Sequence, residues 1–114
     1  MARTPQEIFE QHVAAIQAGD ADAVAADYAE DAVFITPEGV IRGRDEIRSA
    51  FAGLLGEIPD ATWDIPVRHY VDDVLFIEWT AVSEKARAEG VDTLVFQGDS
   101  IRVQTVRFTL EPTG

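Results

Sequence analysis

The spacing of the apolar residues changes along the chain, and this change most limits the folds that the chain can adopt. Near the start, apolar residues recur every three or four positions, as at Phe9, Val13 and Ile16, which is typical of one face of a helix. From residue 61 onward, apolar and β-branched residues run together or alternate, as they do in strands. This order predicts an α+β domain in which helices cover one face of a curved, mostly antiparallel sheet.

The first helix is expected over residues 5–18, because clear start and stop signals surround it. Thr4 is placed to be the N-cap, and Glu7 three residues later completes a capping box. Gly19 fits the position after the helix, where a left-handed backbone favours glycine.

The remaining elements follow from the same reasoning. The prediction comprises further helices over 21–29 and 44–56 and strands over 32–36, 40–43, 61–71, 74–83, 91–97 and 101–110. Residues 84–90 are interpreted as a hairpin loop into which strand extends. Asp22 and Asp27 are interpreted as part of the solvated, acidic side of the second helix.

Charge and cysteine content exclude several classes of protein. The 21 acidic residues outnumber the 9 basic ones, for a net charge of −12, which argues against nucleic-acid and anionic-membrane partners. With no cysteine, the chain has no disulfide, thiol nucleophile or thiolate ligand. Its two histidines, His12 and His69, cannot form a three-histidine zinc site. We therefore expect no metal site.

From length and hydropathy we expect a single-domain cytoplasmic protein. A chain of 114 residues corresponds to one domain, expected over 1–114. Its apolar runs are too short to span a bilayer, and its first residues lack the apolar stretch of a secretion signal.

One stretch carries a family resemblance. Residues 26–34 read Ala-Asp-Tyr-Ala-Glu-Asp-Ala-Val-Phe, and Pro37, Gly39 and Gly-Arg-Asp-Glu-Ile at 43–47 follow. With the order of elements, this resembles the nuclear-transport-factor-2-like (NTF2-like) superfamily, in particular the SnoaL-like polyketide cyclases and the ketosteroid isomerases. The resemblance covers nearly the whole chain. It implies a conical half-barrel with a pocket at its wide end, and a homodimer formed through the outer face of the sheet.

Compared residue by residue, the resemblance to ketosteroid isomerases implies a polar pocket that has lost its usual base. Where those enzymes carry an Asp base before a Pro-x-Gly turn, this chain has Thr36, which is no base near neutral pH. Their oxyanion-hole Tyr on the first helix matches His12, and their protonated Asp on a central strand matches Asp92. A further network Tyr matches Tyr28, whereas the third-helix Tyr is replaced by Phe51.

His12 and Asp92 also stand out from the pattern alone. His12 shares the apolar face of the first helix with Ile8, and Asp92 shares a strand face with Leu94. An imidazole titrates near neutral pH, and burial raises the pKa of a carboxylic acid. We therefore expect Asp92 either to orient His12 or to stay protonated and donate to a substrate oxygen. The alternatives are a satisfied core histidine and an aspartate that caps a loop.

Apolar side chains are expected to form the pocket walls. They are Trp63, Ile77, Trp79, Leu94, Phe108 and Phe51. Alternation places Ile77 and Trp79 on one face of the strand over 74–83 and Glu78 on the other. The match to the family at Asp92, extended backwards without a gap, implies that Ile77 and Trp79 face the pocket and that Glu78 lies on the outer face. The opposite register would make Glu78 a replacement base.

These observations lead to three hypotheses. The first is a cofactor-free SnoaL-like enzyme that moves a proton next to the carbonyl of a small apolar compound, in an isomerisation, cyclisation or dehydration. His12 would be its base or proton shuttle, and Tyr28 and Thr36 would assist by hydrogen bonds. The second is a module that binds a small apolar molecule or dimerises without turnover. The third is an epoxide hydrolase of the limonene type, whose Asp–Arg–Asp set is represented here by Asp92 alone.

Overall fold

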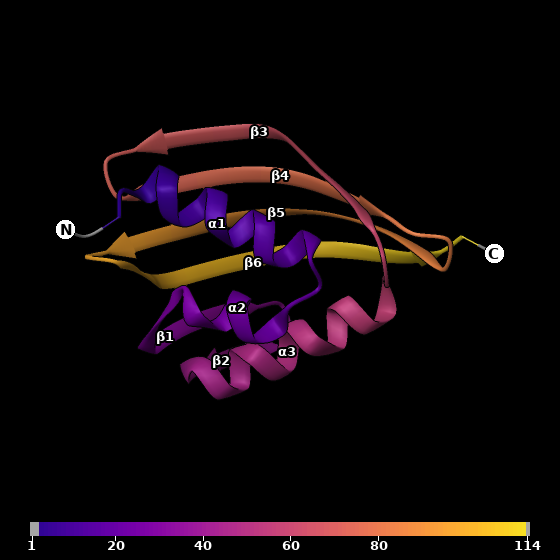
Figure 1. Ribbon diagram of the computed structural model, residues 1–114, viewed down its shortest axis with the longest axis horizontal. Coiled ribbons are helices and arrows are strands. Elements are labelled where there is room, and N and C mark those ends of the chain that lie inside the picture. The colour runs from indigo at the N-terminus through magenta and orange to yellow at the C-terminus, as the bar shows by residue number, and fades with distance from the viewer. Residues whose placement is uncertain (1–2, 114) are drawn as a thin grey trace.

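Three helices pack on the same face of one curved, six-stranded sheet (Figure 1). The computed structural model describes residues 3–113. The helices are α1 (Pro5–Gln17), α2 (Ala21–Ala26) and α3 (Gly43–Glu57). The strands are β1 (Tyr28–Thr36), β2 (Gly39–Arg42), β3 (Thr62–Val71), β4 (Val74–Val82), β5 (Ala86–Gln97) and β6 (Ser100–Pro112). The α+β class and the face-covering arrangement predicted from the sequence are confirmed.

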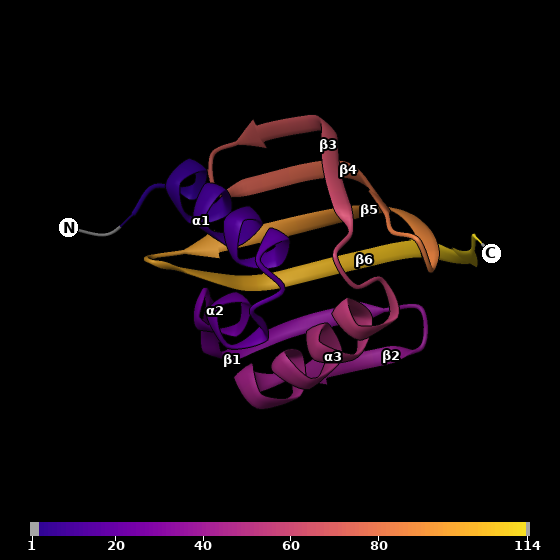
Figure 2. The same cartoon turned by 45° about the vertical axis from the view of Figure 1, so that its right-hand side comes forward.

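The strand order is β2-β1-β6-β5-β4-β3. Strands β3 to β6 form an antiparallel meander, and β1 and β2 form a hairpin. The two parts meet where β1 pairs with β6 in parallel, so the sheet is mixed and β6 is a central strand. Figure 2 shows the sheet curving around α1 and α3.

The signals that start and stop α1 act as the sequence predicts. The backbone N–H of Glu7 donates to Thr4 Oγ1 at 3.1 Å, and the N–H of Thr4 donates to Glu7 Oε1 at 2.8 Å. Gly19 follows the helix with a φ of +69°, a conformation that suits glycine.

The predicted end of the second helix is wrong. Helix α2 stops at Ala26, and Tyr28 already belongs to β1. The reason lies in β6, where the N–H of Ile101 donates to the carbonyl of Asp27 at 2.8 Å. Tyr28 then pairs with Ile101 in the sheet. The backbone of residues 27 and 28 is therefore hydrogen-bonded or paired to β6 and does not continue the helix.

The predicted hairpin loop over 84–90 is too long. Strand β5 begins at Ala86, and the turn before it is held by Ser83 Oγ, which accepts from the N–H groups of Lys85 and Ala86. Ala86 and Ala88 face inward and are buried, whereas Arg87 and Glu89, which alternate with them, are exposed. These charged and small residues therefore form an alternating strand, although their composition is typical of a loop.

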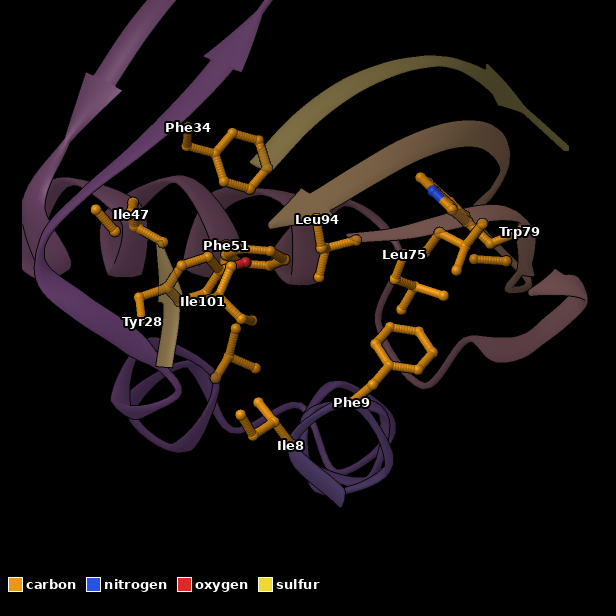
Figure 3. Close-up of a cluster of buried hydrophobic side chains, with 14 of the residues drawn as sticks. Ile8, Phe9, Tyr28, Phe34, Ile47, Phe51, Leu75, Trp79, Leu94 and Ile101 are labelled. Carbon is orange, nitrogen blue, oxygen red and sulfur yellow. The ribbon is translucent and has the colours of Figure 1, made fainter. Parts of the chain in front are cut away.

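The hydrophobic core lies between the helices and the inner face of the sheet (Figure 3). Its fully buried side chains come from nearly every element, among them Ile8, Tyr28, Ile47, Leu75, Leu94 and Ile101. Within residues 3–113, no helix combines the length and the apolar composition needed to cross a membrane.

Candidate functional site

A cavity of about 440 Å³ opens between α1, α3 and the inner face of the sheet. Most of its lining is apolar, with residues such as Phe9, Val13, Ile16, Phe34, Ile41, Phe51, Leu54, Ile65, Ile77 and Val106. Its polar lining residues are His12, Thr36, Glu38, Ser49, Glu57, Asp92 and Gln104. Because an apolar cavity with a few polar groups is the usual form of a small-molecule site, this is the candidate site.

Three aromatic rings form one wall of the cavity. The ring centroids of Trp63 and Trp79 are 5.3 Å apart, and those of Trp79 and Phe108 are 6.0 Å apart. Gly90 on β5 makes this packing possible, because a Cβ there would lie 2.7 Å from both Phe108 Cβ and Trp79 Cζ2. We call Trp63, Trp79 and Phe108 the aromatic wall.

Asp92 is a buried carboxylate at the floor of the cavity. Its side chain accepts from Trp79 Nε1 and from Gln104 Nε2, each at 2.7 Å, and the residue is 5% exposed. Burial raises the pKa of Asp92 to about 6, although the two hydrogen bonds oppose this rise. Asp92 is therefore an acid that exchanges its proton close to neutral pH.

His12 lies in the same cavity, and its partner is Asp27. His12 Nδ1 lies 3.1 Å from Asp27 Oδ2, and Arg3 Nη1 donates to the other oxygen, Oδ1, at 3.0 Å. Burial acts to raise the pKa of Asp27, but the hydrogen bonds from His12 and Arg3 outweigh it and leave this pKa below its ordinary value. Asp27 is thus an acceptor, which assigns the proton to His12 Nδ1.

Tyr28 and Gln104 connect the His12–Asp27 pair with Asp92. The Tyr28 hydroxyl lies 3.4 Å from His12 Nε2 and donates to Gln104 Oε1 at 2.5 Å. Gln104 is 4% exposed, and its amide donates onward to Asp92. Burial first, and then the charges of Asp92 and Asp27, hold the pKa of Tyr28 well above its usual range, so its hydroxyl stays a donor. We call His12, Tyr28, Gln104 and Asp92 the polar network.

One of the two roles expected of Asp92, and the position expected of Asp27, are wrong. His12 and Asp92 do not pair directly, because Tyr28 and Gln104 lie between them. Asp27 is not on a solvated face, because α2 ends before it and its side chain turns inward to His12. The His–Asp pair that the sequence led us to expect therefore exists with a different aspartate.

Most of the predicted site residues line the cavity. Trp63, Ile77, Trp79, Phe108 and Phe51 line the cavity as expected, and Asp92, His12 and Thr36 also reach it. Thr36 is engaged in its own turn, where Oγ1 accepts from the N–H groups of Glu38 and Gly39. Leu94 is fully buried in the core and is not a lining residue. Glu78 is exposed on the outer face, as the preferred register requires.

Sequence reasoning missed Gln104, Asp27 and Arg3 as members of the site. A signal for Gln104 was present, because it alternates with Val106 and Phe108 and so belongs to the same inner face of β6. No comparable pattern points to Asp27 or Arg3, whose roles arise only in three dimensions. Among residues 3–113, no three His, Asp or Glu side chains are grouped in a way that could hold a metal ion.

Comparisons with solved structures support the fold. The chain is similar to an NTF-2 like protein of unknown function from Burkholderia xenovorans LB400, with a TM-score of 0.80 and 20% identity over 92% of this chain and 82% of that one. It is also similar to a SnoaL-like protein of unknown function from Burkholderia thailandensis E264, with a TM-score of 0.76 and 17% identity over 91% and 93% of the two chains.

A third similar structure is a protein with a ketosteroid isomerase-like fold from Catenulispora acidiphila DSM 44928, in complex with trimethylamine. Its TM-score is 0.75, with 20% identity over 92% of this chain and 86% of that one. No curated protein matches the chain in sequence. The family model of the SnoaL-like domain matches residues 9–104, and the chain therefore belongs to the SnoaL-like family and has the NTF2-like fold.

Proposed function

We propose that the chain is an enzyme that moves a proton next to the carbonyl group of a small, largely apolar compound, with Asp92 as its acid and base. One observation carries the proposal. Asp92 is a buried carboxylate that lines an otherwise mostly apolar cavity, and its hydrogen-bond donors, Trp79 and Gln104, are both neutral. A carboxylate in such a setting is poorly solvated and is therefore a stronger base than one in water.

The proposed reaction follows from the position and pKa of this group. The apolar body of the substrate packs against the aromatic wall, and Asp92 takes a proton from the carbon beside the carbonyl. With a pKa of about 6, Asp92 is mostly ionised at neutral pH and can still return the proton readily. Return to another carbon gives isomerisation. The enolate can alternatively add to a second carbonyl group of the substrate, whose oxygen then takes the proton from Asp92, or expel a β-hydroxyl group that takes this proton and leaves as water. Every step uses groups of the chain itself and needs no cofactor.

The rest of the polar network holds Asp92 in place in this proposal. Asp27 orients His12, and Tyr28 donates to Gln104, whose amide group then has its N–H directed at Asp92. His12, Tyr28 and Gln104 are thus positioning residues. Thr36 has no role here, since its hydroxyl is used in a turn.

Proton exchange tests the proposal without a known substrate. A panel of small cyclic ketones is incubated with the protein in D₂O, and ¹H NMR follows the loss of the protons beside the carbonyl. We expect the wild type to accelerate exchange of at least one ketone, and Asp92→Asn to reduce this rate at least about 100-fold. The control is Asp22→Asn, which removes an exposed carboxylate outside the cavity. Equal rates for wild type and Asp92→Asn would refute the role of Asp92.

A second function, binding without turnover, is favoured by a different observation. Within residues 3–113, every buried side-chain nitrogen and oxygen has a hydrogen-bond partner, as in a network that serves structure alone. In that case, ligands that quench tryptophan fluorescence would be recovered from D₂O without any exchanged proton. We do not propose an epoxide hydrolase, because no arginine lines the cavity in the part of the chain that the structure describes.

We also propose a homodimer formed through the outer face of the sheet. Val74, Val95 and Val103 lie opposite one another on β4, β5 and β6, and the three helices all lie on the other face (Figure 1). Val74 is 40% exposed. Sedimentation velocity tests this, since Val95→Lys should yield monomers whereas Gln17→Lys, at an exposed position of α1 on the other side of the sheet, should leave the dimer intact.

A further inference from the structure

The charge of the cavity is one-sided. Its lining contains three carboxylates, those of Asp92, Glu38 and Glu57, and within residues 3–113 it contains no lysine or arginine. The guanidinium of Arg68 lies 5.2 Å from the centroid of the Phe9 ring but does not line the cavity. His12 is the one basic residue of the described lining, and its Nδ1 is paired with Asp27. A ligand that enters the cavity therefore meets the charge of these carboxylates with no lysine or arginine of the lining to balance it.

The backbone adds to this negative potential. Helix α3 ends at Glu57, and its last turn carries no basic residue. The C-terminal end of a helix bears a partial negative charge from carbonyl groups that have no partner within the helix. Glu38 lies in the turn between β1 and β2, and Figure 2 shows this turn and the end of α3 at the same end of the molecule. We call the exposed lining residues Glu38 and Glu57 the mouth of the cavity.

Aromatic rings complete an environment that suits a cation. Trp63 and Phe108 of the aromatic wall are partly exposed, and Phe108 reaches 38%. The face of an aromatic ring attracts a cation within about 6 Å, and tryptophan does so most strongly. Alkylated ammonium groups gain most from such rings, because they are both charged and apolar.

We propose that the cavity selects small apolar molecules that carry a cationic ammonium group. The cation is held by the mouth and by the partly exposed rings of Trp63 and Phe108, and the apolar remainder extends toward the floor. The inference rests on the proposed function only for the chemistry at Asp92. The preference for a cation is a property of binding and is measured without turnover.

Two probes of the same shape test the proposal. Benzyltrimethylammonium carries the cation, and neopentylbenzene replaces its nitrogen by carbon. Trp63 and Trp79 are the only tryptophans of the chain and both line the cavity, so their fluorescence reports binding. At pH 7.5 and low ionic strength we expect the ammonium compound to bind about tenfold more tightly than its neutral counterpart. Equal or tighter binding of neopentylbenzene, or no binding of the ammonium compound, would overturn the proposal.

Matched variants locate the source of the preference. The double variant Glu38→Gln/Glu57→Gln should reduce the ratio of the two affinities by at least about threefold, because it removes the charge of the mouth. The control, Glu10→Gln/Glu84→Gln, removes two exposed carboxylates that do not line the cavity and should preserve the ratio. If both double variants change the ratio equally, the overall charge of the protein is responsible and the assigned site is wrong.

The two proposals fail in different ways. If the ammonium compound is preferred and no ketone exchanges its protons, the cation site stands and the proposed function fails. If Asp92-dependent exchange occurs and neopentylbenzene binds as tightly as the ammonium compound, the function stands and the cation site fails.

Discussion

The indole N–H of Trp79 donates to Asp92 Oδ1 at 2.7 Å. A group with its own NMR signal is thus hydrogen-bonded directly to the buried carboxylate of the cavity. Both residues are buried, and they lie on the adjacent strands β4 and β5. Because the charge of the carboxylate changes the strength of this hydrogen bond, the indole resonance of Trp79 records the protonation state of Asp92.

The first prediction concerns this titration. The ¹H–¹⁵N signal of Trp79 Nε1–H should shift with a midpoint near the pKa of about 6 that burial imposes on Asp92, whereas the indole of Trp63 should shift far less. In Asp92→Asn the step should vanish. A Trp79 signal that stays constant between pH 5 and 7.5 would show that Asp92 does not titrate in this range.

The second prediction concerns stability and pH. Because the pKa of Asp92 is higher in the folded state than its ordinary value of 3.8, folding favours the protonated form. Stability is therefore lost as pH rises from about 4 to about 6. The loss reaches on the order of 3 kcal/mol above pH 7. Asp92→Asn avoids this loss, so urea unfolding should show its advantage over wild type growing with pH in that interval and then levelling. An advantage that shrinks with rising pH would contradict the prediction.

The third prediction compares the contributions of two aspartates, the buried Asp27 and the exposed Asp22, to the free energy of unfolding. Asp27→Asn removes the charged partner of His12 and Arg3 and should cost about 1–3 kcal/mol of unfolding free energy at pH 7. Because the pKa of Asp27 is lowered, its contribution is full above its ordinary value and declines in acid below it. Asp22→Asn, which loses only a surface pair with Arg48, should change stability by less than about 0.5 kcal/mol. Chemical denaturation of both variants provides the measurement, and equal losses would contradict the burial of Asp27.

The fourth prediction concerns Gly90. In Gly90→Ala the new methyl group would lie 2.7 Å from Trp79 Cζ2 and Phe108 Cβ, so the aromatic wall must move. We expect a loss of about 1–3 kcal/mol and a change in tryptophan emission. Gly56→Ala is the matched control, because open space surrounds this position within α3. That variant should gain about 0.5–1 kcal/mol. A neutral Gly90→Ala with unchanged emission would refute the close packing.

The sequence predicted those parts of the molecule whose causes are local. Helix α1 follows from its capping box and apolar spacing, and the shared face of Ile77 and Trp79 follows from alternation along one strand. The family resemblance pointed to the half-barrel and to His12 and Asp92 as cavity residues, both of which line the cavity.

The parts that escaped prediction depend on partners far away in the chain. Helix α2 ends early because Ile101 binds the carbonyl of Asp27, and no property of residues 21–29 reveals this. Asp27 resembles its exposed acidic neighbours in sequence, and only the approach of His12 and Arg3 makes it a buried acceptor. A buried charge is decided by which groups meet it, so local pattern is a poor guide to it.

The central position of β6 affects the order in which the molecule can be completed during synthesis. The β1–β2 hairpin and the β3–β5 meander are both translated before β6, yet β6 is the strand that joins them in the sheet. It also supplies Gln104 to the polar network and Phe108 to the aromatic wall. A nascent chain on the ribosome therefore holds two unjoined sheet fragments with exposed edges until β6 emerges, and the cavity cannot be completed before this strand has been added.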